Sequence, residues 1–181
     1  MNPVTTYKTL KNPTEPVLYK DKGSKFIGYA FPIESKDNFK AHIDKLKQEH
    51  TSAGHFCFAY QLGIDTPYHR TSDDGEPSNS AGLPIYGQLQ AFGVTNVLVV
   101  VVRYFGGTKL GTGGLVKAYS DAVKLVVDAC PTTLKRQLSE VTLTCPYDLS
   151  GRIEHLCQKH DAEIKQRGYT NDLTLTLAIP T

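Results

Sequence analysis

The sequence lacks any hydrophobic stretch long enough to cross a membrane. Its longest wholly apolar run is Val97 to Val102, whereas a membrane-spanning helix needs ~18 apolar residues. The segment from Met1 to Thr6 has neither the basic start nor the apolar stretch of a secretory signal. We therefore expect a cytoplasmic protein with no membrane association.

Cysteine and histidine patterns of metal sites are also lacking. The four cysteines contain no CxxC pair, and the histidines show no HExxH or similar spacing. Cys57, Cys130 and Cys157 stand among apolar residues, which is typical of buried, inert thiols. We assign no metal and no cofactor.

The chain has little net charge. Twenty Lys and Arg residues against 18 Asp and Glu give a formal charge of +2. The net charge therefore gives the whole molecule no general affinity for polyanions. Any nucleic-acid site must come from a local cluster of basic residues. With 40% hydrophobic and 21% charged residues, the composition is typical of a soluble globular protein.

The distribution of turn and apolar residues predicts two domains. Residues 1–15 contain Pro3 and Pro13 and few apolar residues, so we expect a loose leader. Residues 16–131 form the main domain, and 132–138 a linker. Residues 139–181 then predict a β-α-β-β order, the first part of a ferredoxin-like unit that needs a further helix and strand to close.

Within the main domain, hydrophobic periodicity and turn residues set the expected elements. A hairpin turn at Asp21-Lys22-Gly23 separates the first two strands. The expected elements are strands at 17–19 and 26–31, a helix from Ser35 to about residue 50, a strand at 55–60, a polar loop at 64–84, a helix at 85–92, a strand at 94–102 and a helix at 115–129.

The densest feature is the glycine loop, defined as residues 103–114, which holds five glycines between a buried strand and a helix. Glycine lets a ligand approach the backbone closely. A helix that begins there presents unpaired N–H groups and a partial positive charge, which suit phosphate or carboxylate. Residues 103–136 contain six Lys or Arg against two Asp, a local charge of +4.

We therefore predict an anion-contacting surface at the glycine loop, although the glycines could also serve only a tight turn and close packing. The loop is not a phosphate-binding Walker A loop, because the GxxxxGK[ST] spacing is absent. The candidate residues are Arg103, Tyr104, Phe105, Gly106, Gly107, Lys109, Gly111, Gly113, Gly114 and Lys117.

A second dense feature is the acidic loop, defined as residues 72–82, in which the candidates are Asp73, Asp74 and Glu76. Three carboxylates so close together could hold Mg²⁺ or act as acid and base. They could equally form an ordered turn, or pair Asp73 or Glu76 with Arg103 and lock the two loops together. We favour the two structural interpretations.

His55 and Cys57 could form a nucleophile and its base, because residues two apart on a strand share a face. The sequence supplies no third group to orient them and no oxyanion hole. We interpret them as a strand-end histidine beside a buried thiol and assign no catalytic residue.

Long motifs identify a resemblance to the YigZ/IMPACT family. The acidic loop matches as Ser-Asp-Asp-Gly-Glu-Pro followed by Ala-Gly-x-Pro at residues 81–84, and the glycine loop matches within a longer block that runs from Val100 to Tyr119. Lys25-Phe26-Ile27 and His55-x-Cys57-x-Ala59-Tyr60 resemble two further family blocks. The match extends in order from about residue 16 to residue 130.

The resemblance implies an α+β fold. The N-terminal domain would be like the second domain of ribosomal protein S5, with a mixed sheet and helices on one side. The C-terminal part would be a partial ferredoxin-like domain like the last domain of elongation factor G. The resemblance also implies a link to translation, since eukaryotic relatives in the IMPACT branch regulate initiation through a protein partner.

We therefore expect a non-enzymatic binding protein for RNA, the ribosome or a translation factor, with a protein partner as a further option. Arg103, Lys109 and Lys117, with Lys135 and Arg136, would contact phosphates, and Tyr104 and Phe105 would offer stacking. The alternative is an enzyme acting on a phosphorylated small molecule or nucleotide, in which the acidic loop holds Mg²⁺ or moves a proton.

Overall fold

The computed structural model describes residues 6–64 and 66–180. They form two compact units, of which one spans residues 8–133 and the other joins residues 134–180 to Thr6 and Tyr7. No helix among the described residues is long and apolar enough to cross a membrane.

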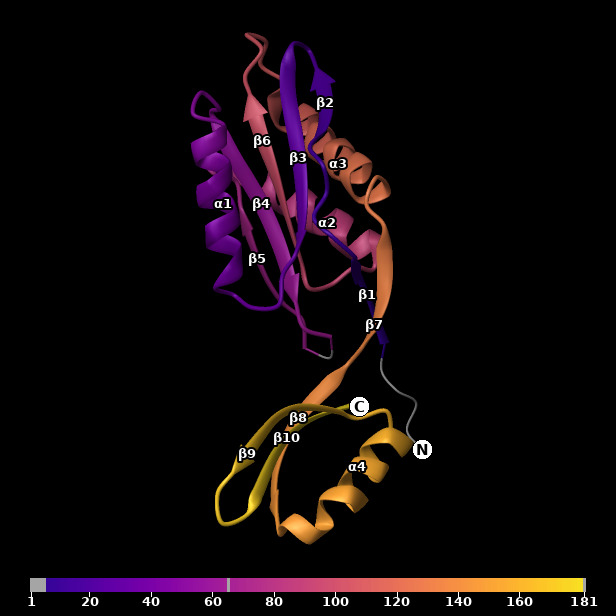
Figure 1. Ribbon diagram of the computed structural model, residues 1–181. Helices are drawn as coiled ribbons and strands as arrows, with labels where there is room; N and C mark the ends of the chain where they lie inside the picture. The colour runs from indigo at the N-terminus through magenta and orange to yellow at the C-terminus, as the bar shows by residue number, and fades with distance from the viewer. Residues whose placement is uncertain (1–5, 65, 181) are drawn as a thin grey trace. The chain divides into compact units, whose positions relative to one another are not determined.

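The larger unit is built on a five-stranded sheet with three helices (Figure 1). In chain order, the elements from the first described strand to β7 are β1 (Thr6–Leu10), β2 (Val17–Asp21), β3 (Ser24–Pro32), α1 (Asn38–Glu49), β4 (His55–Leu62), β5 (Tyr68–Ser72), α2 (Gly82–Phe92), β6 (Val97–Tyr104), α3 (Gly111–Asp128) and β7 (Thr132–Arg136).

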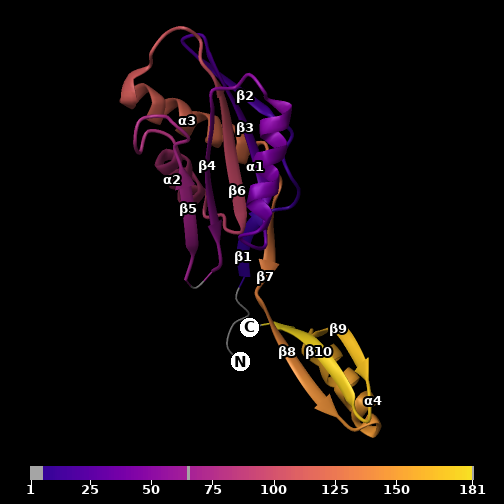
Figure 2. The same ribbon diagram turned by 90° about the vertical axis from the view of Figure 1, so that its left-hand side faces the viewer.

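The strand order is β2-β3-β6-β4-β5, so β6 is the central strand. Figures 1 and 2 show α1 on one face of this sheet and α2 and α3 on the other. Alternate residues of β6 enter two separate cores: Val99 and Val101 pack under α2 and α3, whereas Val100 and Val102 pack under α1. The apolar run of β6 therefore serves both faces.

The predicted α+β class is confirmed, and two details of the expected sheet are corrected. Every neighbouring pair of strands in it is antiparallel rather than mixed. The helices lie on both faces rather than on one. The reason is the pattern of β6, whose residues Val97 to Val102 are all fully buried and need cover on each side.

Three segments expected to be irregular contain strands. Strand β1 lies within the expected leader, and it forms a two-stranded sheet with β7, which lies within the expected linker. Strand β5 lies within the expected loop at 64–84 and pairs with β4 at the edge of the large sheet. Residues 1–5 of the leader lie outside the described residues.

The smaller unit has the β-α-β-β order that the sequence predicts. Its elements are β8 (Leu138–Cys145), the single-turn helix η1 (Tyr147–Leu149), α4 (Ser150–Lys159), β9 (Glu163–Tyr169) and β10 (Leu173–Pro180). Strand β10 pairs antiparallel with both β8 and β9 and lies between them. This is the split β-α-β arrangement of a ferredoxin-like unit. Its core forms around Leu173, Leu175 and Cys157.

Candidate functional site

The glycine loop and the acidic loop meet at the end of the central strand. Arg103 follows Val99 and Val101 on the face of β6 that α2 and α3 cover, so its side chain lies beneath α3. The guanidinium Nη1 donates to Glu76 Oε1 at 2.6 Å. The two side chains are only 6% and 4% exposed. Of the structural alternatives, the locking pair is therefore the one with Glu76.

Further groups surround this buried ion pair. The Tyr119 hydroxyl of α3 donates to Glu76 Oε1 at 2.7 Å. Ser24 Oγ lies 3.4 Å from Arg103 Nη2 and accepts the Gly106 N–H at 3.1 Å. The guanidinium also lies over the ring of Phe26. Among the described residues, Arg103 Nε has no hydrogen-bond partner although it is buried.

Asp73 organises the acidic loop and the start of α2. Its Oδ1 accepts the N–H groups of Ala81 and Gly82 at 2.9 and 2.8 Å, and its Oδ2 accepts that of Asn79 at 2.8 Å. A carboxylate in this position satisfies donors at the start of a helix that have no partner within it. Both carboxylate oxygens are therefore committed to the backbone.

Asp74 has a similar structural role. Its Oδ2 accepts the Phe56 N–H at 2.7 Å, and its carbonyl oxygen accepts from His55 Nδ1 at 2.9 Å. Its backbone has a φ of +40°, which an Asp tolerates better than most residues. The described residues contain no group of three or more His, Cys, Asp or Glu that could hold a metal ion.

Cys57 is enclosed beneath the acidic loop. Its Sγ lies 3.0 Å from the Asp73 carbonyl oxygen and 3.2 Å from the Tyr119 hydroxyl. Burial raises the pKa of the thiol above its ordinary value of 9.0, and the nearby carboxylates, led by Glu76, raise it further. Burial likewise raises the pKa of Tyr119. Cys57 therefore stays protonated at neutral pH, contrary to what a nucleophile requires.

The glycine loop remains open where the acidic loop is closed. A pocket of about 280 Å³ lies between the two loops and the start of α3. Lys109 lines it and makes no ion pair among the described residues. Leu110, which precedes α3, provides no side-chain cap for the first N–H groups of the helix. The residues that line the pocket are Glu76, Pro77, Arg103, Phe105, Lys109, Leu110, Gly111, Thr112 and Leu115.

Two glycines of this loop differ in what they permit. A Cβ on Gly106 would lie 1.9 Å from the Gly23 carbonyl carbon, so packing alone requires glycine there. A Cβ on Gly113 would meet nothing within 4 Å, and Gly113 has no positive φ. Packing and turn geometry therefore explain Gly106 but not Gly113, which lies in the first turn of α3.

The structure separates several of the other predicted site residues from this pocket. Tyr104 faces the opposite side of the sheet, where its hydroxyl lies 2.8 Å from His50 Nδ1. It therefore cannot form one stacking surface with Phe105, which is 56% exposed beside the pocket. Lys117 is exposed on α3 and pairs with Asp121 at 2.5 Å. Gly107 and Gly111 have positive φ and shape the loop, and Gly114 lies against Leu110.

The structure also places the two linker candidates, Lys135 and Arg136, and it reveals two site residues that the sequence did not predict. Arg136 pairs with Asp161 within the smaller unit. Lys135 and Arg136 are the last two residues of β7. Sequence reasoning missed the roles of Ser24 and Tyr119 in the buried network. Tyr119 had a usable signal, because a tyrosine on the apolar stripe of a helix needs a partner for its hydroxyl once it is buried.

Comparisons with known proteins match both units. The family model of the Impact N-terminal domain matches residues 22–127, and that of a domain of unknown function matches residues 143–181. The IMPACT family member YigZ of Escherichia coli (strain K12) is 38% identical over 166 residues, which cover 91% of this chain and 81% of YigZ.

Two further proteins extend the comparison. A solved structure described as the crystal structure of a hypothetical protein has a TM-score of 0.81 and 36% sequence identity, and it covers 97% of this chain and 85% of its own. The IMPACT homolog of Saccharomyces cerevisiae is 32% identical over 114 residues, which cover 60% of this chain and 43% of the yeast protein.

Proposed function

The chain belongs to the IMPACT family, and on that premise we propose that it is a non-enzymatic, translation-linked protein that binds RNA phosphates at the glycine loop. The link to translation follows from the resemblance, whose eukaryotic branch regulates initiation, and from the similarity to the yeast IMPACT homolog. RNA is the partner that the chemistry of the pocket favours.

The observation that carries the proposal is the unequal use of charge in the two loops. The acidic side chains are taken up by the protein itself: Asp73 by three backbone N–H groups, Glu76 by Arg103 and Tyr119. They are thus poorly placed to move protons or hold Mg²⁺ for catalysis. Lys109 and the uncapped start of α3 remain available to an anion.

Phe105 and Gly113 fit the same partner. Phe105 is largely exposed beside the pocket, where its ring can stack on a base while Lys109 contacts the adjacent phosphate. Gly113 does not itself line the pocket, but it follows the lining residues Gly111 and Thr112, and the open space around it leaves the first backbone N–H groups of α3 accessible to a phosphate. Arg103 acts from beneath, holding the loop in place rather than contacting the phosphate itself.

The experiment measures RNA binding and ribosome cosedimentation over a range of salt concentrations. Affinity should fall steeply as salt rises, because binding releases counterions from the phosphates. Lys109→Gln should weaken binding to all RNA sequences and reduce the salt slope by about one unit. Lys40→Gln, which alters an exposed lysine of α1 on the other face of the sheet, is the matched control and should leave both unchanged.

Two outcomes would overturn the proposal. One is the absence of RNA and ribosome binding at low salt. The other is thermal stabilisation by nucleotides or phosphate metabolites with no stabilisation by RNA, which would instead favour the enzyme on a phosphorylated small molecule.

A further inference from the structure

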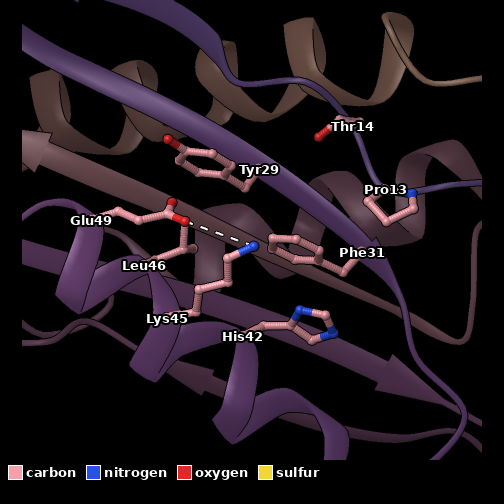
Figure 3. Close-up of a pocket in the computed structure, with 8 residues that line it drawn as sticks. All are labelled: Pro13, Thr14, Tyr29, Phe31, His42, Lys45, Leu46 and Glu49. Atoms are coloured by element: carbon pink, nitrogen blue, oxygen red, sulfur yellow. Dashed lines mark ion pairs between the residues drawn. The ribbon is translucent and has the colours of Figure 1, made fainter.

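A second pocket lies on the opposite face of the sheet, between α1 and β3 (Figure 3). Its volume is about 350 Å³, within the range of small-molecule sites. Positions 42, 45, 46 and 49 lie on one face of α1, and positions 29 and 31 lie on one face of β3. Both elements therefore direct side chains into the same pocket. The lining residues are Pro13, Thr14, Tyr29, Phe31, His42, Lys45, Leu46 and Glu49.

Three of the lining rings lie nearly parallel. The planes of Tyr29 and Phe31 differ by 3°, with ring centroids 6.4 Å apart. The His42 ring stacks on Phe31 with centroids 4.2 Å apart and an angle of 20°. The Tyr29 hydroxyl is fixed 2.6 Å from His50 Nε2. Tyr29 is 9% exposed and His42 already covers one face of Phe31, so a flat aromatic ligand would stack on the partly exposed rings of His42 and Phe31.

Two charged side chains edge the same pocket. Figure 3 shows Lys45 and Glu49 extending from α1 across the pocket toward Tyr29 and Phe31. Lys45 Nζ lies 3.8 Å from Glu49 Oε1, and the side chains are 74% and 48% exposed. So exposed a pair contributes little stability and is readily exchanged for contacts with a ligand. The Lys45–Glu49 pair presents an ammonium donor beside two carboxylate oxygen acceptors.

We propose that this pocket binds a guanine base, either in a free nucleoside or nucleotide or as an unpaired guanine of RNA. The edge of guanine presents the acceptor O6 next to the donors N1–H and N2–H. Lys45 donates to O6, and the Glu49 carboxylate accepts both N–H groups in a charge-assisted, two-bond contact. Adenine presents a single donor beside one acceptor on this edge and cannot make the second bond to the carboxylate.

The environment of His42 supports the stacking role. Burial lowers the pKa of His42, and the charge of Lys45 lowers it further. The imidazole is therefore neutral at neutral pH and adds a flat, uncharged ring to the set. Because the pocket and the glycine loop lie on opposite faces of the sheet, the guanine site does not depend on the proposed RNA-phosphate site.

The test is calorimetric titration of the full chain with guanosine, inosine and adenosine. Inosine is guanosine without the 2-amino group, so it loses one bond to Glu49. We expect guanosine to bind about tenfold more tightly than inosine, and inosine no less tightly than adenosine. No binding of guanosine at millimolar concentration, or equal affinity for all three nucleosides, would overturn the proposal.

Matched variants of α1 assign the preference to Glu49. Glu49→Gln should reduce the ratio of guanosine affinity to inosine affinity to near one, because an amide cannot accept both N–H groups in the same way. Asp44→Asn alters an exposed carboxylate of the same helix outside the pocket and should keep the ratio. A ratio unchanged by Glu49→Gln would refute the assignment. Thermal unfolding of each variant checks that the fold is intact.

The source of the base and the independence of the two sites are tested separately. A short unstructured RNA with one guanine is compared with the same RNA carrying inosine at that position. Discrimination between these RNAs supports recognition within RNA, and discrimination only between the free nucleosides supports a free ligand. Lys109→Gln should leave guanosine affinity unchanged, so failure of the phosphate site and failure of the guanine site are distinguishable.

Discussion

The acidic loop and the glycine loop lie side by side, yet they use their polar groups in opposite ways. The acidic loop directs its carboxylates into the protein, onto backbone N–H groups, Arg103 and Tyr119. The glycine loop leaves Lys109 and the start of α3 open to solvent. Charge density in a sequence therefore does not by itself locate a binding surface. What matters is whether the fold satisfies those charges internally.

The largest expected effect comes from breaking the lock between the loops. Glu76→Gln leaves the buried Arg103 without a counter-charge and should lower the free energy of unfolding by about 3–5 kcal/mol. Chemical denaturation measures this change. Lys124→Gln, which removes an exposed ion pair with Asp121, is the control and should change stability by less than ~1 kcal/mol. Equal losses in the two variants would contradict the closed acidic loop.

A pair of apolar replacements sharpens the same point. The double variant Glu76→Leu, Arg103→Met removes both charges together and leaves neither uncompensated. It should therefore be more stable than Glu76→Gln alone. A double variant that is less stable would mean that the ion pair stabilises the loops beyond what packing can replace.

An intermediate effect is expected from alkaline pH. Because burial raises the pKa of Cys57 in the folded state, the unfolded chain loses this proton first as pH rises. Protonation of Cys57 therefore does not change the free energy of unfolding below the ordinary thiol pKa. Above that pKa, the free energy of unfolding falls by about 1.4 kcal/mol per pH unit. Denaturation at pH 8.5, 9.5 and 10 under reducing conditions should show a smaller slope for Cys57→Ala. Identical slopes would count against a desolvated thiol under the acidic loop.

The smallest expected effect separates stability from binding in the glycine loop. Gly113→Ala should stabilise the fold by about 0.5–1 kcal/mol, since alanine favours a helix more than glycine and has room there. The same change should weaken RNA binding, because its methyl group occupies the approach to the backbone. Gly87→Ala in α2 also meets nothing within 4 Å; it should stabilise equally and leave binding unchanged. Equal RNA affinity in both variants would show that Gly113 serves no ligand.

Much of the fold could be predicted because its elements have strong local patterns. The uninterrupted apolar residues of β6 and the apolar stripe of α3 specify a buried strand and a core-facing helix. Strand β5 was missed because residues 68–70 are exposed and all five of its residues are aromatic or polar, so no apolar alternation marks it. Its structure depends on pairing with β4, a tertiary contact.

The site was harder to predict than the fold. Sequence reasoning left Asp73 and Glu76 as equal partners for Arg103, because the choice depends on the path of the acidic loop. That path includes positive φ at Asp74, Gly75 and Asn79. These residue types tolerate positive φ, but they do not determine which carboxylate reaches Arg103. Tyr104 was grouped with Phe105 although adjacent residues at a strand end point to opposite faces. The guanine pocket had no sequence signal, since it joins a helix and a strand that are unrelated in sequence.

The position of the central strands also constrains when each sheet can form during synthesis. In the five-stranded and the three-stranded sheet the middle strand is the last one in chain order: β6 follows β2 to β5, and β10 follows β8 and β9. A nascent chain that ends before β6 holds two separate hairpins, β2–β3 and β4–β5, with no partner between them. Each of these two sheets is therefore completed in one late step, and until then its unpaired strand edges and apolar faces favour aggregation.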